Sequence, residues 1–161
     1  MFTSILCPID GSDTSLYALD MAADLAAEQG AQLTVCTVVN PSKASAMAFG
    51  DPAMSAACFD ALDDEASAMV ADALKAISQT KAQGVRLDGN TVDCIVHYAT
   101  EQKCDLIVMG SHGRSGIQRA LIGSVAEGVL RNANIPVLVV RHRHARAGNA
   151  AAPEAATPAK V

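Results

Sequence analysis

Short apolar runs separated by longer helix-like segments constrain the fold of this chain more than any other feature. The clearest runs are SILCPID, QLTVCTVVN, CDLIVMG and IPVLVVR. None of them alternates apolar with polar residues, so each is expected to be covered on both faces. Parallel strands packed between two layers of helices have this pattern, and a half-exposed antiparallel sheet does not.

The segments between these runs have helical periodicity. We expect helices over 13–29, 56–83, 91–102 and 124–132, the first ending at Gly30, the second ending at Gly84 and the third capped by Asn90. A weak third strand is expected at 85–89. Residues 41–55 are rich in Ala, Ser, Pro and Met and show no period, so we expect a long loop there. This loop could be a lid, a partner surface or simply disordered.

Alternation of five strands and four helices predicts an α/β fold. With right-handed crossovers the result is an open, doubly wound, five-stranded, mostly parallel sheet with helices on both faces, similar to the Rossmann architecture. Ligands in such folds bind beyond the carboxyl ends of the strands. Asp10, Asn40 and Gly110 follow the first, second and fourth of the expected strands, so these positions are candidates for a binding site.

Composition excludes several classes of protein. The chain has 161 residues, the size of one domain, and we place that domain at 1–141, with a low-complexity, disordered tail at 142–161. A net charge of −5 argues against nucleic-acid binding, and the segment 51–72, with six acids and no base, is especially acidic. No apolar run could span a membrane. Five cysteines without a CxxC pair argue against zinc and disulfides, which favours the cytoplasm.

The loop GSHGRSGIQRALIGS, residues 110–124, carries the clearest functional signal. Ser124 and Glu127 have the spacing of a capping box, which predicts a helix beginning at Ser124. The first amides of that helix and its dipole would form an anion site. Glycines at 110, 113 and 123 allow a ligand to approach the backbone closely. The Walker A, GxGxxG and GxSxG patterns are all absent.

The spacing G-x2-G-x9-G-S in this loop resembles the ATP-binding branch of the universal stress protein family. The resemblance covers about residues 2–141 and includes ILCPIDGSDTS, VVN and IGSVAEGVLRNANIPVLVVR. It implies that ATP, or ADP or AMP, lies across the strand ends together with Mg. Asn40 stands where many relatives carry Asp. A homodimer paired through the last strand, Pro136 to Val140, is also implied.

The resemblance further implies a role for each residue that matches the family motif. Adenine would meet the main chain near Pro8 and Val38, and Asp10 would stand near the ribose or the metal and phosphates. Met109 and Gly110 would border the ribose. The phosphates would be surrounded by Gly113, Gly123, Ser124 and Val125, the last three through their amides and Ser124 also through its hydroxyl, with Arg114 adding positive charge.

Three functions remain open from the sequence. The first is a nucleotide-responsive regulator in the stress response, with at most slow hydrolysis and no catalytic residues. The second is a partner-binding dimeric module whose nucleotide site is vestigial. The third is a slow ATPase or phosphotransferase that uses Asp10 and His112. Asp10 could instead help to cap the first helix, and His112 could simply face solvent from its loop.

Overall fold

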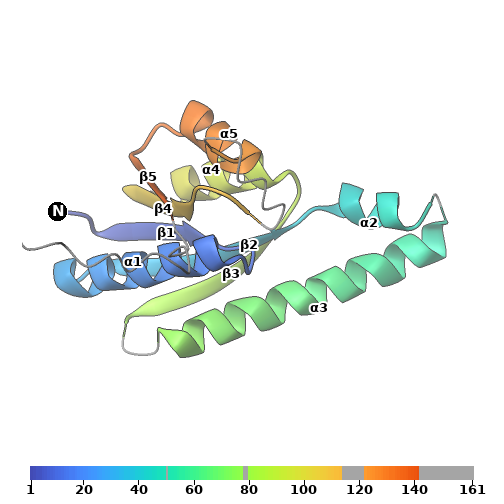
Figure 1. Ribbon diagram of the computed structural model, residues 1–161, viewed down its shortest axis with the longest axis horizontal. Coiled ribbons are helices and arrows are strands. Elements are labelled where there is room, and N and C mark those ends of the chain that lie inside the picture. The colour runs from blue at the N-terminus through green and yellow to red at the C-terminus, as the bar shows by residue number, and fades with distance from the viewer. Residues whose placement is uncertain (50, 78–79, 114–121, 142–161) are drawn as a thin grey trace, which may run out of the picture.

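Figure 1 shows the computed structural model, which describes residues 1–49, 51–77, 80–113 and 122–141. One parallel sheet organises the chain, with its strands in the order β3-β2-β1-β4-β5. The strands are β1 (Ser4–Pro8), β2 (Gln32–Val39), β3 (Ala82–Asp88), β4 (Leu106–Gly110) and β5 (Val137–Val140). The strand order reverses between β1 and β4, so the carboxyl ends of these two strands flank the topological switch point. The predicted α/β fold is confirmed.

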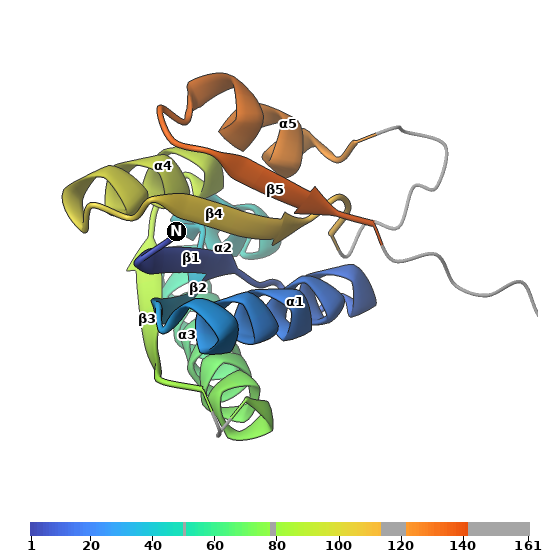
Figure 2. The same cartoon turned by 90° about the vertical axis from the view of Figure 1, so that its left-hand side faces the viewer.

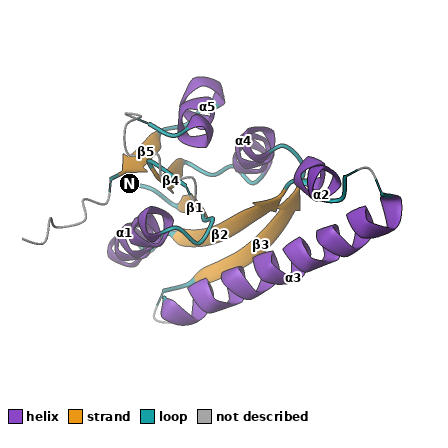
Figure 3. Cartoon of the chain, turned by 45° about the vertical axis from the view of Figure 1, so that its right-hand side comes forward, coloured by secondary structure: helices purple, strands orange, loops and turns teal. Residues whose placement is uncertain are grey.

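Helices cover both faces of the sheet. Helices α1 (Asp13–Gln29) and α3 (Pro52–Ala76) lie on one face, and α4 (Thr91–Glu101) and α5 (Ser124–Asn132) lie on the other (Figures 1 and 3). The short helix α2 (Pro41–Met47) packs on α3 beyond the end of the sheet. Figure 2 shows β5 beside β4 at one edge of the sheet, with α5 next to it. Within the described residues, no helix is long and apolar enough to cross a membrane.

Successive residues of the central strands point to opposite faces of the sheet, and both faces are buried. Ile5 and Cys7 pack with α1 in one core, while Leu6 belongs to a second core that also contains Ile95 of α4 and Val129 of α5. All five side chains are at most 1% exposed. This is the physical reason for the unbroken apolar runs, because a polar residue on either face would lose its water.

The ends of α1 follow the predicted signals. The Ser12 side chain accepts a hydrogen bond from the Ser15 amide and caps the first turn. Gly30 ends the helix in the left-handed conformation with φ 66°, which a residue without Cβ adopts at little cost. Asn90 caps α4 in the predicted way, with its Oδ1 accepting from the amides of Val92 and Asp93.

The expectation of a loop at 41–55 is wrong. Two helices begin inside this segment, each at a proline that directly follows a capping side chain. Asn40 Oδ1 accepts from the Ser42 amide before α2, and Asp51 Oδ1 accepts from the Ala53 amide before α3. Proline suits the first helical position because its missing N–H would have no partner there. The sequence therefore held two helix starts, and composition masked them.

The predicted helix over 56–83 is also too long, and the third strand is longer than 85–89. Helix α3 ends at Ala76, and β3 runs from Ala82 to Asp88 because each of its residues pairs with β2. Gly84 lies inside the strand instead of ending a helix. A Cβ there would overlap the side chains of Val70 and Leu74 on α3, so the glycine lets the helix pack closely on the sheet.

Candidate functional site

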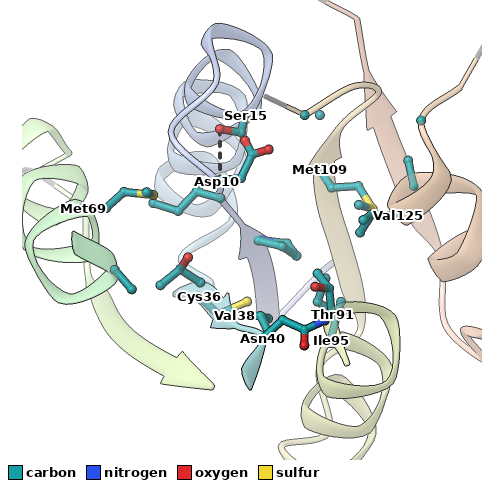
Figure 4. A pocket seen from close by; sticks show the side chains of 18 of the residues that line it. Asp10, Ser15, Cys36, Val38, Asn40, Met69, Thr91, Ile95, Met109 and Val125 are labelled. Atoms are coloured by element: carbon teal, nitrogen blue, oxygen red, sulfur yellow. Dashed lines mark hydrogen bonds between the residues drawn. The ribbon is translucent and has the colours of Figure 1, made fainter. Parts of the chain in front are cut away.

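A cavity of about 360 Å3 lies at the carboxyl ends of β1, β2 and β4, where the topology predicts a ligand site. Strand ends form its floor, α3 forms one wall, and the first turns of α4 and α5 form the other (Figure 4). Met69 of α3 and Met109 of β4 lie on opposite sides of the cavity in this view. The site therefore joins segments that are far apart in the sequence.

Nine of the ten predicted site residues line this one cavity, and the tenth, Arg114, lies outside the described residues. The nine are Pro8, Asp10, Val38, Met109, Gly110, Gly113, Gly123, Ser124 and Val125. They come from three strands, one helix and the loops that follow β1 and β4. Their convergence supports the residue set, and their roles toward a ligand stay predictions.

The carboxylate of Asp10 supports the start of α1 from the cavity floor. Its Oδ1 accepts from the Ser12 amide at 3.1 Å and from the Ser12 hydroxyl at 2.6 Å. The Asp10 amide donates to Ser15 Oγ at 3.4 Å (dashed line in Figure 4). The interpretation that Asp10 helps to cap the first helix is therefore confirmed. Its Oδ2 lies against Gly113, where a Cβ would overlap it, so the carboxylate also contacts the loop that follows β4.

The three described glycines of the loop, Gly110, Gly113 and Gly123, each lie where another segment approaches closely. A Cβ on Gly110 would lie 3.0–3.1 Å from the backbone of Thr14 and Ser15 at the start of α1, and one on Gly113 would overlap Asp10 Oδ2. A Cβ on Gly123 would lie 3.1 Å from the Ser111 carbonyl oxygen. Any larger residue would push these segments apart and change the width of the cavity.

Helix α5 begins at Ser124 as predicted, but Ser124 does not cap it. The N-cap is Gly123, which has no side chain to satisfy the first amides. The first main-chain bond of the helix runs from the Glu127 amide to the Gly123 carbonyl. The capping-box prediction fails because Ser124 is already in helical conformation, so its hydroxyl is not needed as a cap.

The uncapped amides of α5 point to an anion. The amides of Ser124, Val125 and Ala126 have no acceptor among the described residues, and all three residues line the cavity. The Gly123 amide was also expected to contribute, but it donates to the Ser111 carbonyl at 2.7 Å and is occupied. Unpaired amides with the helix dipole behind them attract negative charge.

Ser111 and His112 form a polar pair beside these amides. Ser111 is 1% exposed, and its Oγ lies 3.0 Å from His112 Nδ1. The Ser12 hydroxyl also lies 3.5 Å from the His112 carbonyl oxygen. His112 is half-buried and lines the cavity, so it does not simply face solvent from its loop.

Sequence reasoning missed the wall that α3 supplies. Leu62, Glu65, Ala66 and Met69 line the cavity, and their spacing of three, four and seven residues marks one face of a helix. That periodicity was available as a signal. Lys43 of α2 also reaches the cavity and is the only Lys or Arg among its described lining residues. It was missed because its segment was interpreted as a loop.

The cavity floor also contains a thiol. Cys36 is 0% exposed and lines the cavity from β2. Burial, with smaller contributions from the neighbouring Cys7, Cys104 and Cys94, raises the pKa of Cys36 well above its ordinary value. The floor is therefore uncharged at this point. The described residues contain no group of three or more His, Cys, Asp or Glu side chains placed to hold a metal ion.

Comparison with known proteins identifies the family. The sequence profile of the universal stress protein family matches residues 1–141. The chain belongs to the universal stress protein family. A curated relative, universal stress protein MJ0531 of Methanocaldococcus jannaschii, is 36% identical over 147 residues, covering 88% of this chain and 83% of that protein.

Solved structures of similar proteins have the same fold. The structure of hypothetical protein MJ0577 superimposes on this universal stress protein with a TM-score of 0.79, at 26% identity, covering 90% of this chain and 99% of the other. A universal stress protein crystallised in complex with cAMP gives a TM-score of 0.63 at 29% identity, covering 87% of this chain and 97% of the other.

Proposed function

We propose that this universal stress protein binds an adenine nucleotide, ATP or its diphosphate or monophosphate, in the cavity and acts as a nucleotide-responsive regulator. The observation that carries the proposal is the set of uncapped amides at Ser124, Val125 and Ala126, which face the same cavity as the strand ends. They supply donors for a phosphate without a lysine. The similar protein crystallised with cAMP, itself an adenine nucleotide, supports this ligand class.

The main chain of Val38 supplies polar groups for the base. The Ile9 amide donates to the Cys36 carbonyl, so at Cys36 the groups of β2 face β1. The N–H and C=O groups of Val38, two residues further along β2, face the same way, because the direction of the backbone groups repeats at every second residue of a strand. There, β1 has already ended at Pro8. The N–H and C=O of Val38 are thus directed past the end of β1, and they match the acceptor N1 and donor N6 of adenine.

We assign the other described residues of the predicted set to the space between these two subsites. Met109 and Gly110 border the ribose. Gly113, which has no side chain, lets the phosphates approach the backbone closely. Asp10 Oδ2 stands on the same side, where a carboxylate suits a ribose hydroxyl or a Mg ion held by the phosphates. Mg would neutralise phosphate charge and orient it. We expect at most slow hydrolysis, because Asp10 is engaged in the start of α1 and no P-loop lysine is present.

The proposal includes a cytoplasmic homodimer. Strand β5 is the sheet edge next to β4, and its residues Val137, Leu138 and Val139 are only half-buried. Pairing of this edge with a second copy would cover them and remove an open row of hydrogen-bonding groups. Sedimentation of the purified protein tests this part: a monomer at micromolar concentration contradicts it.

Calorimetric titration tests the ligand. Purified protein, stripped of any copurified nucleotide, is titrated with Mg-ATP, AMP and adenosine. Saturable binding is expected for all three, with adenosine weakest because it lacks the phosphate. Gly123→Val should weaken ATP binding about tenfold or more and adenosine binding less, because the added side chain would collide with Ser111 and His112. Absence of saturable ATP binding to the stripped protein refutes the proposal.

Turnover is measured with the same protein. Phosphate release well above background that is lost in Asp10→Asn would favour the ATPase or phosphotransferase over the regulator. Release that is slow and unchanged in Asp10→Asn agrees with the regulator.

A further inference from the structure

Residues 41–65, with Gly50 outside the description, form an arm that extends beyond the end of the sheet (Figures 1 and 3). The arm consists of α2 and the N-terminal half of α3. Within the described arm, only Ala44 and Ala48 are buried, and α3 has no buried residue before Ala66. A hydrogen bond of 3.3 Å between Ser45 Oγ and Ser55 Oγ joins the two helices. About half of α3 therefore has an outer face that packs against nothing described in the chain.

The tip of the arm exposes its large apolar side chains. Phe49 is 97% exposed, Met47 is 56% exposed and Met54 is 52% exposed. The outer face of α3 continues from this tip through exposed alanines, namely Ala53, Ala57 and Ala61. Alanines allow another helix to approach closely, and grouped exposed apolar side chains mark interaction surfaces in soluble proteins.

The arm carries a net negative charge. Residues 41–65 contain one base, Lys43, and five acids, namely Asp51, Asp60, Asp63, Asp64 and Glu65. Asp60 and Asp64 lie one turn apart on the exposed side of α3, and neither takes part in an ion pair within the described structure. The surface thus combines apolar contact area with unneutralised carboxylates.

We propose that the arm is a docking surface for a basic amphipathic helix of a partner protein. The apolar side of such a helix would cover Phe49, Met54 and the alanine face, and its Lys or Arg residues would neutralise Asp60 and Asp64. Helix-in-groove recognition with flexible methionines works in this way. A second copy of this chain fits less well, because two arms would bring identical carboxylates together. Nucleic acids and anionic membranes are repelled by the same charge.

Methionine methyl NMR tests the proposal, because the methionines report on separate sites. Met47 and Met54 lie on the arm, whereas Met69 and Met109 line the nucleotide cavity. The probe is a synthetic amphipathic helical peptide of Leu and Lys, at physiological salt. Saturable shifts of the Met47 and Met54 methyls are expected, and a peptide in which Glu replaces Lys should cause none. Because ATP would instead shift Met69 and Met109, failure of this proposal is distinct from failure of nucleotide binding.

Matched variants distinguish docking on the arm from nonspecific electrostatic attraction between the basic peptide and the acidic protein. Asp60→Asn/Asp64→Asn should weaken peptide binding about tenfold, because two ion pairs are lost. The control Asp24→Asn/Glu28→Gln removes two exposed acids with the same spacing from α1 and should leave the affinity unchanged. Phe49→Ser should weaken binding, and Leu130→Ser on α5, 41% exposed, should not. All these positions are exposed, so the fold should persist, as checked by circular dichroism.

Three results would overturn the proposal. They are no saturable peptide binding, equal loss in the control variants, and methyl shifts of Met47 and Met54 that depend on protein concentration alone. The last result would assign the arm to a second copy of the chain. Shifts caused by anionic vesicles but not by the peptide would assign it to a membrane.

Discussion

Gly113 faces Asp10 so closely that a methyl group on its Cα would overlap the carboxylate oxygen Oδ2. The other oxygen of this carboxylate, Oδ1, accepts from the Ser12 amide and hydroxyl at the start of α1. The loop after β4 and the loop after β1 therefore lie in close contact beside the cavity. A change on one side must displace the other.

Gly113→Ala is expected to weaken ATP binding about tenfold and to lower the free energy of unfolding by about 1 kcal/mol. The added methyl group displaces Asp10, which weakens its hydrogen bonds to Ser12 and changes the width of the phosphate side of the cavity. Calorimetry and urea denaturation measure the two effects. Unchanged affinity in a folded variant would show that this contact does not shape the site.

Gly84→Ala provides the matched comparison, a glycine-to-alanine change away from the cavity. Its Cβ would overlap Val70 and Leu74 in the packing of α3 on β3. We expect a loss of about 1–3 kcal/mol in unfolding free energy, typical of overpacking, with ATP affinity retained. A tenfold loss of affinity here would mean that the cavity responds to packing at any distance, and Gly113→Ala could no longer be interpreted locally.

Ser124→Ala distinguishes a cap from a ligand contact. Because Gly123 is the N-cap, removal of the Ser124 hydroxyl should change the unfolding free energy by less than about 0.5 kcal/mol. ATP affinity should fall several-fold while adenosine affinity is kept. A loss near 1 kcal/mol in the unliganded protein would instead support the capping box. Denaturation without ligand and titration with both ligands decide between the two.

Asp105 should contribute to stability in a pH-dependent way. Burial alone would raise its pKa, but hydrogen bonds from the Thr3 amide, the Thr3 hydroxyl and the Ser4 amide outweigh burial and lower the pKa below its ordinary value of 3.8. This stabilisation is therefore complete above the unfolded pKa and is lost as pH falls through the lower, folded value.

Asp105→Asn tests this contribution by urea denaturation from pH 7 down to pH 2. We expect a loss of about 1 kcal/mol at pH 7, modest because the group is close to solvent, which shrinks toward zero at the acid end. A difference between variant and wild type that does not depend on pH would contradict the role of the charge.

Cys7 should contribute to stability in the opposite sense, at alkaline pH. Burial, with a smaller effect from Asp20, raises the pKa of its thiol from 9.0 to about 12. The thiol stays neutral in the folded protein while the unfolded chain ionises. Its contribution is thus complete below the unfolded pKa and is lost between pH 9.0 and about 12. Cys7→Ala should reduce the fall in stability over this window, as measured by urea denaturation, and an unchanged slope would contradict the assignment.

The local sequence pattern was sufficient to predict the strands that are packed against apolar side chains on both faces. The apolar runs of β1, β2, β4 and β5 can only be covered on both faces, so the sequence by itself determined a parallel sheet between helices. Side chains also fixed local ends, as at Ser12, Gly30 and Asn90. The spacing of Gly110, Gly113, Gly123 and Ser124 pointed to a loop that holds an anion, and these four residues line one cavity.

Only the tertiary structure decided the conformation of residues at which long-range contacts outweigh the local sequence signal. Gly84 reads as a helix end, but pairing with β2 and the approach of α3 place it inside β3. Ser124 reads as a cap, but the Gly123 amide is held by Ser111 and Ser124 enters the helix. Lys43 and Met69 reach the cavity only because α2 lies beyond the end of β2 and α3 folds back along β2 and β3. A one-dimensional pattern records what each residue prefers, whereas which preference prevails depends on the surfaces that the folded chain brings against it.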